Sequence, residues 1–278
     1  MSFDNNPFRG IMLVTDMDGT LLDGKSRISE GNQKAIKRFI AGGGLFTVAT
    51  GRMFKAVEPY LPVLPMNIPA IVYNGAAIYD FSAKKVLWQD CLPANLENVA
   101  ESVLRQFPDT GLEVFHGEDI YLAAQNEETD SHMVREGFHP IYASLKDIPQ
   151  PWLKLLVAAE PGRLLEVEDF LKERKEEFHA VYSEPQFLEL LNKSVSKGSA
   201  LRHLAAMLNF PCSCIVAVGD NRNDLEMLKE AGIGIAVANA HKDAAGAADL
   251  MCRHHDRDAI AEVIGWIEDG TIQCGVAV

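Results

Sequence analysis

The sequence lacks the long apolar run that a membrane-spanning helix requires, because no stretch of it approaches roughly 20 consecutive apolar residues. Residues 1–10 include Asp4 and Arg9 and no long apolar segment, so we expect no secretory signal. The five cysteines are odd in number, which argues against a complete disulfide framework. These absences favour a cytoplasmic protein in a reducing setting, without a membrane partner.

Basic residues are also scarce, since 26 Lys and Arg face 39 Asp and Glu and the formal net charge is −13. Residues 81–190 alone carry about −11 of that charge. Nucleic acids bind to basic patches, so this balance argues against a nucleic-acid partner. An acidic middle segment is typical of a solvated surface, and it would also disfavour polyanionic substrates.

Internal repeats and low-complexity segments are absent as well. The 47% apolar and 23% charged residues are ordinary values for a soluble globular protein. A chain of 278 residues is long for one compact core and suits two domains.

The two ends of the chain alternate between strand and helix patterns. In the first 80 residues, apolar runs at 11–15, 45–49 and 70–73 indicate strands, and the segments between them indicate helices, one capped by Ser29 and one over residues 53–61. The C-terminal part resumes the alternation with helices over 198–208 and 224–231 and strands over 214–218 and 233–237. This order predicts a doubly wound parallel sheet that joins strands of the two parts.

The middle of the chain follows a different rhythm, with strand pairs and helices in place of strict alternation. We therefore predict an α/β fold with a Rossmann-like core domain and an inserted α+β domain. The predicted boundaries are residues 1–82 and 190–278 for the core and residues 83–189 for the insert.

Two acidic motifs follow predicted strands. The first is Asp16-Met17-Asp18-Gly19-Thr20-Leu21-Leu22, and the second is Gly219-Asp220-Asn221-Arg222-Asn223-Asp224. Ligands of open α/β sheets bind at the carboxyl ends of the strands, so four carboxylates would converge there. Two charges about 5 Å apart repel by roughly 3 kcal/mol at an effective dielectric near 20, which favours a bound cation. Oxygen ligands suit Mg²⁺ before Ca²⁺.

Two further segments point to an anion. Thr50, Gly51 and Arg52 follow the second strand and open a helix, where a hydroxyl and backbone N–H groups can hold a phosphate, although Thr50 could equally be a plain helix cap. Arg52 could contact substrate or form an ion pair on the helix face. Lys197 begins a helix against the dipole, so its position calls for an anion or a carboxylate partner. Cys252, His254 and His255 lie close together, but no metal site is favoured there.

These four segments, in this order, resemble the four motifs of the haloacid dehalogenase-like hydrolases. The long insert, Lys197-Gly198-Ser199-Ala200-Leu201 and Tyr73-Asn74-Gly75-Ala76 resemble the Cof-type phosphatases of that superfamily, whose insert is a cap domain. The core motifs are intact, whereas the insert matches in length and pattern only.

The resemblance implies a role for each matching residue. Asp16 matches the nucleophile that forms an aspartyl-phosphate, Asp18 the general acid and base, Thr50 a phosphate-binding hydroxyl, and Lys197 the cation that offsets the charge. The implied Mg²⁺ site comprises Asp16, Asp18 through its carbonyl, Asp220 and, in a supporting layer, Asp224. The remaining substrate-binding or phosphate-binding candidates are Met17, Gly51, Arg52, Asn74 and Asn223.

The function predicted from this resemblance is Mg²⁺-dependent hydrolysis of a small phosphate monoester, a sugar phosphate or a phosphorylated cofactor, by a monomer or weak homodimer. Alternatives are a phosphomutase or a dedicated sucrose- or trehalose-phosphate phosphatase, and a catalytically silent binding module. The presence of both Asp16 and Asp18 argues against the silent module.

Overall fold

The computed structural model describes residues 6–174 and 177–273, which belong to two compact units. The first unit contains the chain up to Gly51, then Val57–Leu87, and the chain from Ser196 onward. The second unit contains Arg52–Ala56 and Trp88–Val195.

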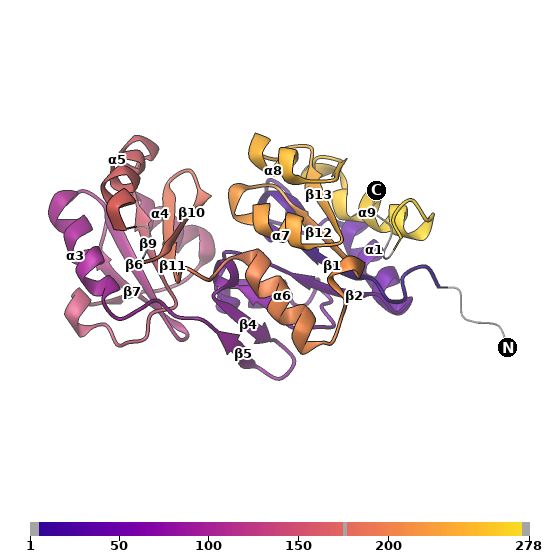
Figure 1. The fold of residues 1–278 in the computed structure, drawn as a ribbon, viewed down its shortest axis with the longest axis horizontal. Coiled ribbons are helices and arrows are strands. Elements are labelled where there is room, and N and C mark those ends of the chain that lie inside the picture. Colours follow the sequence, from indigo (N-terminus) through magenta and orange to yellow (C-terminus); the bar gives the residue numbers. More distant parts are fainter. Residues whose placement is uncertain (1–5, 175–176, 274–278) are drawn as a thin grey trace. The chain divides into compact units, whose positions relative to one another are not determined.

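A five-stranded parallel sheet forms the centre of the first unit (Figure 1), in the order β14-β13-β12-β1-β2. Its strands are β1 (Met12–Thr15), β2 (Leu45–Val48), β12 (Ile215–Gly219), β13 (Ile233–Val237) and β14 (Leu250–Cys252). Met12 lies opposite Leu45 on one side and Ile215 on the other, so β1 is an inner strand, and all four of its residues are buried. The residues after β1 therefore emerge in the middle of the carboxyl edge of the sheet.

Helices flank this sheet: α1 (Glu30–Ala41), α6 (Lys197–Met207), α7 (Leu225–Glu230), α8 (Lys242–Ala247) and α9 (Ala259–Glu268). Helix α1 packs on α9, and α6 packs on α7. Ser29 caps α1 as predicted, because its side chain accepts a hydrogen bond from the backbone N–H of Asn32. The predicted α/β class with a parallel core is confirmed.

The helix predicted over residues 53–61 is shorter than expected. Helix α2 (Phe54–Val57) is followed by the tight turn η2 (Glu58–Tyr60). Pro59 lies within that turn and has no N–H to donate, so a regular α-helix cannot continue through it.

The third strand of the N-terminal part also differs from the prediction. β3 (Ala70–Val72) pairs antiparallel with β4 (Ala77–Asp80) in a small sheet that β5 (Lys85–Gln89) completes, and only the bridge from Ala49 to Ile71 is parallel. The turn η3 (Tyr73–Gly75), with positive φ at all three residues, reverses the chain and makes this local pairing possible.

The second unit is built on a six-stranded sheet in the order β10-β11-β9-β6-β7-β8. The strands are β6 (Gly111–His116), β7 (Asp119–Ala124), β8 (Ile141–Tyr142), β9 (Lys154–Ala158), β10 (His179–Glu184) and β11 (Phe187–Leu191). Helices α3 (Leu96–Gln106) and α5 (Pro161–Leu171) contribute to one apolar cluster with residues of β6, β9 and β11 and the buried Trp152. Helix α4 (Glu127–Glu136) follows β7. Strand β9, central in the sheet, was not predicted from the sequence.

Short helical turns complete the described chain: η1 (Met17–Leu21), η4 (Leu145–Asp147), η5 (Lys172–Arg174), η6 (Cys212–Cys214), η7 (Arg222–Asp224) and η8 (His255–Arg257). Among the helices of residues 6–174 and 177–273, none has the length and apolar character needed to cross a membrane.

Candidate active site

Asp16 and Asp224 share one buried cation. The Nζ of Lys197 lies 2.6 Å from Oδ1 of Asp16 and 2.6 Å from Oδ1 of Asp224, and the Lys197 side chain is fully buried. Asp16 follows β1, Asp224 ends η7, and Lys197 begins α6, so three separate segments meet here. Burial alone would lower the pKa of Lys197, but the two carboxylates raise it above its ordinary value, so the ammonium stays charged. Lys197 was expected to have an anion or a carboxylate partner because it lies at the start of a helix. The structure provides two carboxylate partners.

Asp220 extends this group. Carboxylate oxygens of Asp16, Asp220 and Asp224 lie within 4.8 Å of one another. Burial raises the pKa of Asp16 well above its ordinary value, although Lys197 acts in the opposite direction. Burial and the charge of Asp224 raise the pKa of Asp220 to about 7. The cluster therefore holds more negative charge than one lysine neutralises, and its donors are all oxygen, as a hard divalent cation requires.

Asp224 is the most heavily engaged carboxylate of the three. Its Oδ2 accepts hydrogen bonds from the backbone N–H groups of Asp220 (2.9 Å) and Asn221 (3.1 Å), while its Oδ1 accepts from Lys197. These contacts fix the loop after β12 and orient Lys197. They leave Asp16 and Asp220 as the carboxylates with more capacity for a ligand.

Asp18 is not among the three clustered carboxylates, so the convergence of four carboxylates expected from the sequence holds for three. It belongs to the irregular turn η1, in which Asp18 (φ −78°, ψ 121°) and Gly19 (φ 77°, ψ 0°) depart from helical angles. The side chain of Asp18 is exposed, whereas Met17 is buried. An exposed carboxyl group two residues after Asp16 can exchange protons with a bound molecule or with water.

The remaining anion-site candidates of the first unit lie together beside β2. The backbone of Thr50 accepts a hydrogen bond from the N–H of Asn74 (2.9 Å), and Oδ1 of Asn74 accepts from Nδ2 of Asn223 (2.9 Å). A Cβ at Gly51 would lie 3.0 Å from the Asn74 amide, so these residues are in close contact. Oδ1 of Asn223 is buried and has no hydrogen-bond partner among the described residues. Because Asn223 directly precedes Asp224, an unsatisfied acceptor lies next to the acidic cluster.

Arg52 is buried and belongs to the second unit, unlike Thr50 and Gly51. That unit also buries two ion pairs: Nδ1 of His132 lies 2.9 Å from Oε2 of Glu113, and Nζ of Lys154 lies 3.0 Å from Oε2 of Glu189. Burial opposes the charge on His132, but hydrogen bonds to Glu113 and Glu136 more than offset it and raise the pKa of His132 to about 9.

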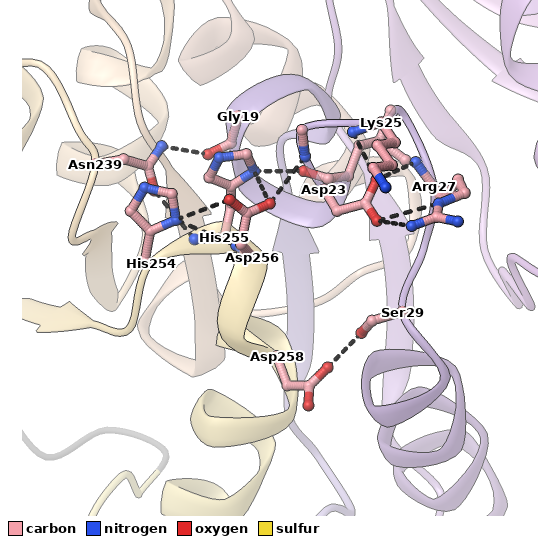
Figure 2. Close-up of polar contacts among 12 residues, drawn as sticks. Gly19, Asp23, Lys25, Arg27, Ser29, Asn239, His254, His255, Asp256 and Asp258 are labelled. Carbon is pink, nitrogen blue, oxygen red and sulfur yellow. Dashed lines mark hydrogen bonds and ion pairs between the residues drawn. The ribbon is translucent and has the colours of Figure 1, made fainter.

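Sequence reasoning did not assign roles to three residues that contact the turn η1 or its surroundings. Oγ1 of Thr20 donates to Oδ1 of Asp220 (3.0 Å), Nδ2 of Asn239 donates to the carbonyl of Gly19 (2.8 Å), and Nδ1 of His255 donates to the carbonyl of Leu22 (2.7 Å; Figure 2). Thr20 lies within the first acidic motif. Asn239 follows β13, so the rule that ligands meet at the carboxyl ends of parallel strands could have pointed to it.

The chain belongs to the haloacid dehalogenase-like hydrolase family, whose model matches residues 13–264. It is 31% identical over 284 residues to the 5-amino-6-(5-phospho-D-ribitylamino)uracil phosphatase YwtE of Bacillus subtilis (strain 168), with 93% of this chain and 98% of the relative covered. It is 27% identical to the pyridoxal phosphate phosphatase YbhA of Escherichia coli (strain K12), with 91% and 97% covered.

Solved structures agree with this assignment. A haloacid dehalogenase-like hydrolase from Bacteroides thetaiotaomicron superposes with a TM-score of 0.81 at 28% identity, covering 93% of this chain and 100% of the other. The predicted family and the prediction of an enzyme are confirmed.

Proposed function

We propose that the protein is a Mg²⁺-dependent phosphatase that hydrolyses small phosphate monoesters through a phosphorylated Asp16. The observation that carries this proposal is the buried contact of Asp16 and Asp224 with Lys197, beside Asp220, at the carboxyl edge of the parallel sheet. Phosphoryl transfer needs positioned charge more than bond-making help, and this group supplies positioned charge.

Asp16 and Asp220 would hold the metal ion, with the backbone carbonyl of Asp18 as a further oxygen donor and Asp224 as the anchor for Lys197. The fit rests on an all-oxygen donor set, in which burial and then the neighbouring carboxylates raise the pKa values of Asp16 and Asp220. When bound, Mg²⁺ would neutralise charge on the phosphoryl group and on the nucleophile.

In the first step, a carboxylate oxygen of Asp16 attacks phosphorus and forms the aspartyl-phosphate bond. The bond from phosphorus to the ester oxygen breaks, and protonated Asp18 donates its proton to that oxygen, so the product leaves as an alcohol. Lys197 stabilises the charge on Asp16 and on the phosphoryl oxygens. Thr50 and the backbone N–H of Gly51, which follow β2, bind the phosphoryl group.

In the second step, Asp18, now a carboxylate, takes a proton from water, whose oxygen attacks phosphorus. The bond to Asp16 breaks, inorganic phosphate forms, and both carboxyl groups return to their starting states. Asn74 and Asn223, joined by a hydrogen bond, are the proposed polar wall of the phosphate site, with Met17 contributing its backbone.

We assign the selection of the leaving group to the insert predicted over residues 83–189, which is the cap in this proposal and which belongs to the second unit from Trp88 onward. The two named relatives act, by their names, on a phosphorylated cofactor and on a phosphorylated ribityl compound. The substrate class that fits these precedents is a small phosphate ester with a polar leaving group. Arg52 is proposed to contact that substrate from the second unit.

The proposal is tested with a panel of small phosphate esters in Mg²⁺, in EDTA, and in EDTA followed by Mg²⁺. We expect turnover in Mg²⁺, its loss in EDTA and its return on adding Mg²⁺. Acid quench during turnover, followed by peptide mass spectrometry, should find phosphate on the peptide that contains Asp16.

Asp16→Asn is the matching variant, because it keeps the shape of the side chain and removes the nucleophile. Asp80→Asn is the control, since Asp80 caps an exposed turn of the same unit through Ser82. The variant at Asp16 should lose turnover and labelling, and the control should keep both. Normal turnover in Asp16→Asn, or full activity after exhaustive chelation, would refute the mechanism.

A further inference from the structure

The turn that carries Asp18 contains a flexible point. Its third residue is Gly19 with φ +77°, a conformation that glycine adopts freely and does not hold by itself. Asp18 is exposed at this turn. A hydrogen bond from the N–H of Leu22 to the carbonyl of Met17 (2.9 Å) closes the turn, and a side chain from a distant segment binds the carbonyl of Gly19 inside it.

The last third of the chain supplies that support. Nδ2 of Asn239 donates to the carbonyl of Gly19 (2.8 Å), and Nδ1 of His255 donates to the carbonyl of Leu22 (2.7 Å). Figure 2 shows both side chains directed at this segment from the loop after β13 and from η8. Both carbonyls lie on the C-terminal side of Asp18: that of Gly19 is inside η1, and that of Leu22 directly follows it.

The two donors are themselves joined. Oδ1 of Asn239 accepts a hydrogen bond from the backbone N–H of His255 (3.1 Å). The side-chain amide of Asn239 therefore has its oxygen facing an N–H group and its nitrogen facing a carbonyl, so its orientation is determined by its partners. The carbonyl of Leu22 can only accept, so Nδ1 of His255 carries the hydrogen. Two residues after Leu22, the N–H of Gly24 donates a hydrogen bond to Oδ1 of Asp256 (2.9 Å).

We propose that Asn239 and His255 are positioning residues that hold the Asp18-bearing turn in the conformation needed for proton transfer. This inference rests on the proposed function, in which Asp18 is the acid and base. Fixing the carbonyl of Gly19 fixes the peptide that joins it to Thr20, whose hydroxyl donates to Asp220. The hydrogen bond from Asn239 to Gly19 thereby positions Asp18, which precedes Gly19, and Thr20, which follows it and binds the acidic cluster. A misplacement of about 1 Å in such a group can cost on the order of 100-fold in rate.

The test compares two leaving groups. p-Nitrophenyl phosphate releases a stable anion and needs little protonation, whereas an alkyl phosphate needs a proton on its leaving oxygen. Since general acid catalysis contributes about 10²–10⁴-fold, a displaced Asp18 should lower kcat/KM for the alkyl ester at least about tenfold more than for the aryl ester. Asp18→Asn removes the acid altogether, so it gives the upper limit for the difference between the alkyl-ester and aryl-ester losses in kcat/KM.

The first variants are Asn239→Ala and Asn239→Asp. The second keeps the shape of the side chain and places an oxygen against the carbonyl of Gly19, so it decides the question if the alanine variant does not fold. At the other donor, His255→Ala removes the hydrogen bond, while His255→Asn keeps a nitrogen donor at the same number of bonds from Cα and should restore the alkyl-to-aryl ratio. His254→Ala is the control, because the ring of His254 lies beside that of His255, with ring centroids 4.6 Å apart, and its Nδ1 accepts a hydrogen bond from the N–H of Asp256 (3.3 Å) instead of binding the turn.

The expected result is a selective loss on the alkyl ester in the Asn239 variants and in His255→Ala, with recovery in His255→Asn and an unchanged ratio in His254→Ala. Equal losses on both esters would show a merely structural role and overturn the inference, as would no loss on either. If the wild-type protein turns over neither ester, the proposed function fails and the inference with it. Wild-type turnover with an unchanged ratio in the variants refutes the inference alone.

Discussion

Replacing Lys197 by Met removes the one cation that Asp16 and Asp224 share. Both contacts are 2.6 Å long, and the side chains of Lys197 and Asp224 are fully buried. Breaking a buried ion pair by removing one partner costs about 3–5 kcal/mol, because the remaining charge is buried without compensation. We expect a loss of this size in the free energy of unfolding at pH 8.

The loss should depend on pH in a defined direction. Without Lys197, the folded-state pKa of Asp16, which burial already raises well above its ordinary value, rises further. A carboxyl group with a raised folded-state pKa destabilises the fold fully at pH values above that pKa. The penalty shrinks as the pH falls towards the unfolded-state value, because the folded protein then takes up a proton. The variant should therefore approach the wild type in stability as the solution is acidified.

The assay is urea unfolding followed by circular dichroism at pH 8 and pH 5.5, in EDTA so that no divalent cation replaces the missing charge. Asp224→Asn added to Lys197→Met should recover part of the loss, because it removes one of the stranded carboxylates. Lys154→Met is the matched control, since it breaks the buried pair with Glu189 in the other unit. A Lys197→Met protein as stable as the wild type at pH 8, or a loss that does not change with pH, would refute this reasoning.

Three further predictions concern residues with single, well-defined constraints. Gly19→Ala would place a Cβ 2.5 Å from Oδ2 of Asp220 at a positive φ, so kcat/KM should fall and the Mg²⁺ concentration for half-maximal activity should rise; unchanged values would contradict this. Gly75→Ala would place a Cβ 2.2 Å from the carbonyl oxygen of Ser196, so the Tm should fall, with a loss of about 1–2 kcal/mol or more from the positive φ alone. The pKa of His132 is raised to about 9, so its charged form stabilises the fold fully below pH 6.5, and this contribution of about 3 kcal/mol should be lost as the pH rises through 9. In His132→Gln, the curve of unfolding free energy against pH should be flatter between pH 6.5 and 10 than in the wild type. A curve as steep as that of the wild type would refute the assignment.

The sequence predicted the site better than the surroundings of the site. Asp16 and Asp220 follow the buried strands β1 and β12, and the carboxyl ends of parallel strands share an edge, so their approach could be inferred without coordinates. The motif also indicated a charged partner for Lys197. The roles of these residues in catalysis remain predictions.

Contacts between distant segments could not be predicted in the same way. Asn239 and Gly19 are 220 residues apart, and no local pattern distinguishes an asparagine that binds a carbonyl from one that faces solvent. The antiparallel course of β3 depended on three consecutive positive φ angles after it, a conformation that the residues Tyr73 and Asn74 permit only rarely. Strand β9 was missed although Pro149 and Pro151 precede it and Pro161-Gly162 follow it, because the period of so short an apolar run does not distinguish a strand from a helix.

The close packing of Gly75 on Ser196 has a consequence for how this family can diversify. The chain leaves the first unit after Leu87 and returns at Ser196, and the return point rests on the turn that precedes β4 and β5. For the parallel sheet, the segment between Leu87 and Ser196 is therefore equivalent to one long loop whose C-terminal end is fixed by packing on Gly75. The entropy of closing a loop grows only with the logarithm of its length, at about 0.6 kcal/mol for each doubling. An insert of different size or sequence could thus replace this one at little cost to the sheet, and the carboxylates of Asp16 and Asp220 would keep their positions.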